Sequence, residues 1–178
     1  RQGLPDALTL RDGTAVESAE VWTAQRRAEL MELFQYFVYG YFPETPATSY
    51  ELAAEDHGAL DGLATYREIV IRFSGEPMEK PDQMTVAIFT PNDRREGTEP
   101  YPVIIGINRC GNHSVHHWGG ITITETVLAG LACTRSQNVR GTHENFWSVE
   151  MILERGYAFA AFHQTDLDSD SENMDDGI

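Results

Sequence analysis

The chain has 178 residues, 41% of them apolar, and a formal net charge of −15. That length and apolar content suffice for one domain with a sizeable core. The acidic excess argues against a nucleic-acid backbone or an anionic membrane as a partner, and no apolar run approaches the roughly 18 residues that a membrane helix needs. We therefore expect one globular unit without nucleic-acid or membrane partners.

The first 40 residues predict an arm followed by a helix. Glycine and proline interrupt any helical period within 1–19, so this stretch is expected to be an extended arm. Between 20 and 40 the pattern predicts an amphipathic helix with one buried stripe. The apolar residues at the spacing of one helix face are Leu30, Leu33, Phe34, Phe37 and Val38.

Two runs rich in β-branched and aromatic residues follow a predicted loop over 43–61. These runs, 64–73 and 84–90, are bounded by turn residues and predict neighbouring antiparallel strands at a sheet edge. The next run, 102–107, is continuously apolar. That composition predicts a central strand buried on both faces.

A long connection then leads to a second buried strand. Helical spacing of apolar residues predicts a helix over 145–155, and 157–162 is again continuously apolar. Strand, connection, helix and strand in this order predict a right-handed βαβ unit in which 102–107 and 157–162 run parallel. The fold class expected is three-layer α/β, with antiparallel edge strands leading into a mostly parallel sheet over 63–178.

Ligands of such sheets bind beyond the carboxyl ends of the strands, which here are the loops starting at Asn108 and His163. The first loop has polar side chains around a glycine and can present backbone N–H groups to an oxyanion. The alternative is an ordinary tight turn whose side chains bond the local backbone. The candidates for a pocket or oxyanion loop are Asn108, Arg109, Cys110, Gly111, Asn112 and His113.

Three histidines, His113, His116 and His117, lie close together in the sequence. Imidazole is the commonest metal ligand, so a metal-dependent enzyme built on these residues is one alternative. The spacing argues against it, because there is no HExxH motif and no carboxylate lies within ten residues before or six after His113. We therefore expect no metal and no other cofactor.

The end of the chain is acidic, with six acids and no base over 166–176. Four of these carboxylates imitate the spacing of a calcium loop, namely Asp166, Asp168, Asp170 and Glu172. Position 6 of that pattern is Ser171 instead of glycine, and position 12 is Gly177 instead of glutamate. The run is therefore expected to be a solvated loop.

The two cysteines, Cys110 and Cys133, are an even count placed around a long connection. A disulfide between them would fit an oxidising compartment. Two free cysteines packed as small apolar residues are the alternative, since neither lies in a spacing that a metal requires.

A serine hydrolase with an α/β-hydrolase fold needs a Gly-x-Ser-x-Gly elbow, then an acid and a histidine. None of the serines of this chain lies in that frame, and Ser148 falls inside a predicted helix. We therefore expect no catalytic residue in this chain.

A series of short motifs occurs in a recognisable order along the chain. They are Leu4–Asp6, Trp22–Gly40, Gly111–His113, Arg140–Gly141, Trp147, Val149–Glu150, Ile152–Leu153 and Arg155–Tyr157, followed by Asp166, Asp168 and Asp170. In order and spacing they resemble the front part of the glucuronoyl esterases of carbohydrate esterase family 15 and of related acetyl xylan esterase-like α/β-hydrolases.

The resemblance implies that 1–178 is the N-terminal part of a single α/β-hydrolase domain, with an arm over 1–19, a helix over 20–40 and the sheet over 63–178. It implies a secreted or periplasmic serine esterase that cleaves glucuronic acid esters in plant cell-wall polysaccharide. In that family the nucleophile, acid and histidine come later in the chain. Residues after Ile178, or a second polypeptide, are therefore the expected partner, and a non-catalytic carbohydrate-binding or structural domain is the alternative.

Overall fold

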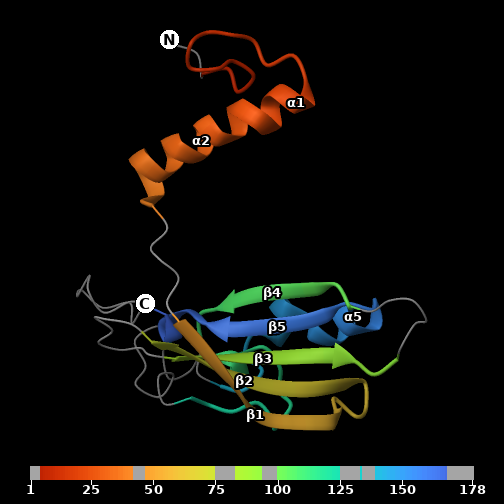
Figure 1. Ribbon diagram of the computed structural model, residues 1–178. Helices are drawn as coiled ribbons and strands as arrows, with labels where there is room; N and C mark the ends of the chain where they lie inside the picture. The colour runs from red at the N-terminus through yellow and green to blue at the C-terminus, as the bar shows by residue number, and fades with distance from the viewer. Residues whose placement is uncertain are drawn as a thin grey trace. The chain divides into compact units, whose positions relative to one another are not determined.

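The computed structural model describes residues 5–41, 47–74, 83–93, 100–124, 133 and 139–167. The chain forms two compact units, Arg1–Thr45 and Pro46–Ile178, which are described separately (Figure 1). Among the described residues, no helix is long and apolar enough to cross a membrane.

The first unit contains one continuous helical stretch, as the sequence predicts. It comprises α1 (Ala19–Val21), η1 (Trp22–Arg26), α2 (Arg27–Phe34) and η2 (Gln35–Tyr39). The Ser18 hydroxyl caps its start by accepting the Val21 N–H, and Gly40 ends it at φ +78°. Within this unit the predicted stripe has no cover, and Phe34 and Phe37 are 51% and 73% exposed. An arm and one helix offer no second apolar surface to cover the stripe.

Arg26 fixes the arm to the helix. Its Nε donates to the Ala7 carbonyl at 2.9 Å, and one terminal nitrogen pairs with Glu29 at 3.0 Å. The arm is less extended than predicted, since it folds back on itself through an antiparallel bridge between Thr9 and Ala15.

The second unit is built on a five-stranded sheet with the order β1-β2-β3-β5-β4. Its strands are β1 (Ala47–Ala59), β2 (Ala64–Ser74), β3 (Gln83–Pro91), β4 (Val103–Asn108) and β5 (Ala158–His163). The β2–β3 pair is antiparallel and the β4–β5 pair is parallel, which confirms both predicted pairings (Figure 1). β3 joins β5 antiparallel, so the described strands form a mostly antiparallel sheet with one parallel pair at its edge, instead of the mostly parallel sheet expected from the sequence.

β1 occupies a stretch that the sequence predicts as a loop. Its residues are mostly small or polar and exposed on both faces, so they give no alternating pattern. The strand forms because its backbone pairs antiparallel with β2 over ten residue pairs. Cross-strand ion pairs join Glu55 to Arg67 at 2.6 Å and Glu51 to Arg72 at 3.0 Å.

β4 is the last strand of the described sheet, and the described residues cover one of its two faces, although the sequence predicts burial on both. Gly106 and Asn108 are buried on the face that carries the core, whereas Ile105 and Ile107 are 67% and 60% exposed on the other face. A continuously apolar run predicts that both faces of a strand are apolar. It does not predict which other residues pack against each face.

The predicted crossover helix consists of two short helices, α4 (Glu144–Trp147) and α5 (Val149–Glu154). Ser148 separates them in the left-handed conformation at φ +49°, which corrects the single helix predicted over 145–155. α5 lies on the core face against β5 and β3. The largest fully buried apolar side chains of this core are Tyr66, Phe89, Phe159, Ile121, Val115 and Val149.

Candidate functional site

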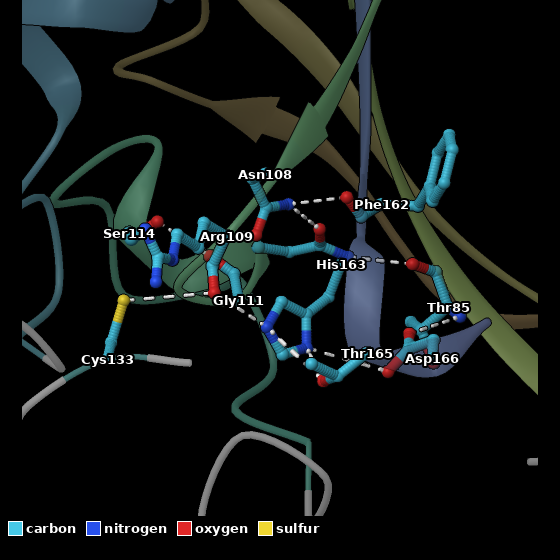
Figure 2. Close-up of polar contacts among 11 residues, drawn as sticks. Thr85, Asn108, Arg109, Gly111, Ser114, Cys133, Phe162, His163, Thr165 and Asp166 are labelled. Carbon is cyan, nitrogen blue, oxygen red and sulfur yellow. Dashed lines mark hydrogen bonds and ion pairs between the residues drawn. The ribbon is translucent and has the colours of Figure 1, made fainter. Parts of the chain in front are cut away.

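The carboxyl ends of the two parallel strands meet at one place, where Asn108 of β4 pairs with His163 of β5 (Figure 2). The loop of sequence candidates leaves β4 at this point and turns through Gly111, whose φ is +91°. A short 3-10 helix, η3 (Asn112–Ser114), then leads the chain inward. The predicted loop therefore lies at the edge of the sheet where α/β proteins bind ligands.

Two asparagines fix the shape of this loop. Asn108 Nδ2 donates to Asn112 Oδ1 at 2.6 Å and to the Phe162 carbonyl at 2.9 Å. Asn112 Nδ2 donates to the Thr85 carbonyl on β3 at 2.8 Å. Both side chains are buried, so their amides connect three strands and are not presented to a ligand.

Most of the other candidate residues are also buried. Cys110, Gly111 and His113 are closed off from solvent, whereas the Arg109 side chain is exposed. Ser114 is fully buried, and its hydroxyl donates to the Gly111 carbonyl at 2.7 Å. The side chains thus behave as the tight-turn alternative requires, and the chemistry left to the loop belongs to its backbone and to the Arg109 guanidinium.

His163 ends β5 at the start of the second loop where the sequence predicts ligand binding, but no pattern in the sequence singles out its side chain. Its Nε2 lies 2.9 Å from the Arg109 carbonyl, which only accepts, so Nε2 carries the ring proton (Figure 2). Its Nδ1 lies 2.8 Å from Thr165 Oγ1. Asp166 is 3.8 Å from Nδ1 and accepts the Thr85 N–H at 3.1 Å.

His163 and Asp166 are residue types that occur in a catalytic triad, but their contacts differ from those that a triad requires. Both ring nitrogens of His163 have protein partners, and the side chains of His163 and Asp166 are each 4% exposed. A general base needs a free nitrogen within reach of the proton it removes. The group therefore holds the turn after β4 to the turn after β5.

The disulfide predicted from the sequence is present between Cys110 and Cys133, with Cα atoms 5.4 Å apart. It ties the loop after β4 to the crossover connection. Cys110 itself is buried, so the bridge fixes the loop at a residue that packs inside the unit.

A second polar group lies along the crossover connection and brings together residues that the sequence keeps apart. His117 Nδ1 is 2.7 Å from Glu144 Oε2, and His116 Nε2 is 3.3 Å from Glu150 Oε1. The hydrogen bond from His117 holds the pKa of Glu144 below its usual range. His113 is buried elsewhere, so the structure joins two of the three histidines that the sequence singled out.

Sequence reasoning missed both glutamates because they lie 27 and 34 residues from their histidine partners. The path of the crossover connection places α4 and α5 next to the loop after β4, and this brings each glutamate to its histidine. Of the calcium-like acids, Asp166 is buried in the turn after β5, and Asp168, Asp170 and Glu172 lie outside the described residues.

No protein-family profile matches the chain. A curated relative, Carbohydrate esterase MZ0003 from an unknown prokaryotic organism, is 32% identical over 98% of this chain and 41% of its own length. A solved glucuronoyl esterase from Solibacter usitatus superposes with a TM-score of 0.83 at 29% identity, over 100% of this chain and 45% of its own. A promiscuous CE15 esterase from a marine bacterial metagenome gives a TM-score of 0.78 at 28% identity, over 97% and 43%.

These likenesses and the sheet place the chain in the α/β-hydrolase fold class. The resemblance to CE15 glucuronoyl esterases, drawn from the sequence motifs, is thereby confirmed over nearly the whole chain. The chain spans less than half the length of these relatives.

Proposed function

We propose that this chain is part of a serine carboxylic-ester hydrolase that cleaves esters of glucuronic acid in plant cell-wall polysaccharide. The observation that carries the proposal is the TM-score of 0.83 to a glucuronoyl esterase together with 29% identity along the whole chain. In this proposal the nucleophile, acid and histidine come from other parts of the hydrolase, by a serine acyl-enzyme mechanism.

The loop from Asn108 to Ser114 contributes one wall of the active-site cleft. Its position at the carboxyl end of β4 supports this role, because oxyanion-binding N–H groups of α/β-hydrolases come from loops at that edge. The buried amides of Asn108 and Asn112 hold the loop backbone in one conformation. Preorganised donors cost no rearrangement when charge develops on the ester oxygen.

Arg109 is the side chain of this loop that reaches solvent. Its carbonyl is held by His163, so the backbone at this position is fixed while the guanidinium extends from the sheet edge. A guanidinium matches the planar geometry of a carboxyl group. We assign it to contact with the uronic acid ester or a neighbouring carboxylate of the polysaccharide.

The remainder of the hydrolase is the proposed partner of the exposed face of the sheet. Alternation along the paired strands puts an apolar set on the side away from α5: Val86, Ile88, Val103, Ile105, Ile107 and Phe162. An uncovered apolar face of this kind calls for a third layer. Residues beyond this chain, or a second polypeptide, supply that layer in the proposal.

The disulfide supports the localisation that belongs to this proposal. A bridge between Cys110 and Cys133 persists in oxidising compartments and is rare in the cytosol. A secreted or periplasmic esterase is also where a cell-wall polysaccharide is accessible.

The proposal is tested by turnover of a glucuronic acid methyl or aryl ester. The protein at its full natural length should hydrolyse the ester and the 178-residue chain alone should not. Turnover by the 178 residues alone would show that the catalytic residues are misplaced. Xylan binding without ester hydrolysis by the full-length protein would favour the non-catalytic domain instead.

Arg109→Ala tests the loop within the same assay. It should reduce kcat/KM by about tenfold or more, the order that loss of one positioned charged contact causes. Arg155→Ala is the matched control, since it removes the same charge from an exposed position after α5. If the two substitutions reduce kcat/KM equally, Arg109 does not contact the substrate in the cleft.

A further inference from the structure

His116, His117 and Glu144 form a group that has no role in the proposed esterase mechanism. One ligand atom from each residue lies within 4.8 Å of the ligand atoms of the other two. The two imidazoles stack with ring centroids 4.4 Å apart. The residues line an open hollow of about 260 Å³ that Glu150 also borders.

We propose that this group binds one divalent transition metal ion of the zinc type. Two imidazole nitrogens and one carboxylate are a donor set that zinc takes in proteins, with a fourth position left for water or a further ligand. Glu150 is placed to occupy that fourth position, since its Oε1 is 3.3 Å from His116 Nε2.

The distances between the ligand atoms of this group are close to those around a bound ion. Ligand atoms on a tetrahedral zinc lie about 3.4 Å from one another, given metal–ligand distances near 2.1 Å. The Glu144 oxygen and His117 Nδ1, now 2.7 Å apart, would separate slightly to admit the ion. The side chains of His117 and Glu144 are 70% and 39% exposed, so small rotations of both are unhindered by packing.

His116 determines how tightly the ion is held. Its Nδ1 accepts the Trp118 N–H at 3.0 Å, so the ring proton of the neutral form sits on Nε2 and faces Glu150. A metal on Nε2 displaces that proton, and the ring proton then belongs on Nδ1, so the bond from Trp118 is given up. We therefore expect affinity in the micromolar range and a changed environment of the Trp118 backbone amide.

The position of the ion explains what it would do. His116 and His117 belong to the loop after β4, and Glu144 begins α4, so the ion would tie the two ends of the crossover connection together. The net charge of −15 raises the local concentration of cations around the chain. The role is structural, and it adds to the tie that the disulfide makes at the start of the same loop.

Calorimetric titration with Zn²⁺, on metal-stripped protein of full natural length without a histidine tag, tests the proposal. We expect one equivalent bound with micromolar affinity, weakened about tenfold or more by His117→Ala and by Glu144→Gln. His57→Ala is the control, since His57 is an exposed histidine 3.5 Å from one carboxylate, Glu55. It should leave the affinity unchanged.

Co²⁺ gives a second readout, because its visible absorption reports nitrogen and carboxylate ligation of the bound ion. If His117→Ala fails to fold, Glu144→Gln decides alone, since its side chain is partly exposed and keeps its shape. Absence of binding, or binding that both variants leave unchanged, would overturn the proposal. The histidine–glutamate contacts would then serve only to hold the loop to the helices.

Discussion

Trp147 lies over Gly106 so closely that a Cβ at position 106 would overlap the indole ring. Trp147 in turn packs against Phe159, with ring centroids 5.8 Å apart. The glycine in the middle of β4 therefore lets α4 reach the sheet and close one end of the core.

Gly106→Ala should lower the free energy of unfolding by about 1 to 3 kcal/mol, the usual cost of overpacking a core. Gly119→Ala is the control, because nothing lies within 4 Å of a Cβ placed there. Denaturant unfolding of both variants measures the difference. An unchanged midpoint for Gly106→Ala would show that the indole moves aside without cost.

Removal of the disulfide should destabilise the protein. The bridge spans 23 residues, and closing a loop of that size stabilises by about 3 kcal/mol in the chain-entropy treatment. Cys110→Ala combined with Cys133→Ala should lower the unfolding midpoint by a corresponding amount. Dithiothreitol should lower the midpoint of the natural protein and leave that of the double variant where it is.

Asn112→Ala tests the buried amide network. It removes the acceptor of Asn108 Nδ2 and the donor to the Thr85 carbonyl, so both remain buried with a bond missing. We expect a loss of about 1 to 3 kcal/mol in stability. Thr14→Ala in the exposed arm is a control for loss of a small polar side chain, and it should have little effect on unfolding.

The sequence predicts the strands and helices whose side chains alternate or recur, because burial on one face leaves a period in the chain. The pairing of 102–107 with 157–162 and the loop at Asn108 follow from that signal. β1 has no such period, since backbone pairing with β2 forms it. The meeting of His117 with Glu144 is set by the path of the crossover, which no local pattern records.

The Glu144 carboxylate should make the free energy of unfolding depend on pH in the acidic range. Its pKa is lowered in the folded protein by the hydrogen bond from His117, so its contribution is present above the ordinary value of 4.5. That contribution is lost as the pH falls through the lowered pKa. Glu144→Gln should therefore lose stability less steeply than the natural protein between about pH 5 and pH 3.

The measurement is urea unfolding at each pH in the presence of EDTA, which keeps metal binding out of the comparison. Glu17→Gln removes the same charge from the exposed arm and should follow the natural protein. If the two variants show the same slope, the contact with His117 does not hold the pKa of Glu144 down.

Ile105→Glu examines the proposed third layer. Ile105 is 67% exposed here, so the charge should be tolerated in the 178-residue chain. In the protein at its full natural length, the proposed cover would bury the charge. We expect the substitution to lower the free energy of unfolding of the full-length protein by about 3 kcal/mol or more, because an unpaired charge would lose its hydration.

Tyr50→Glu on β1, where the ring is 83% exposed, is the matched control. If Ile105→Glu destabilises the full-length protein no more than Tyr50→Glu does, this face is not the one that the rest of the hydrolase covers.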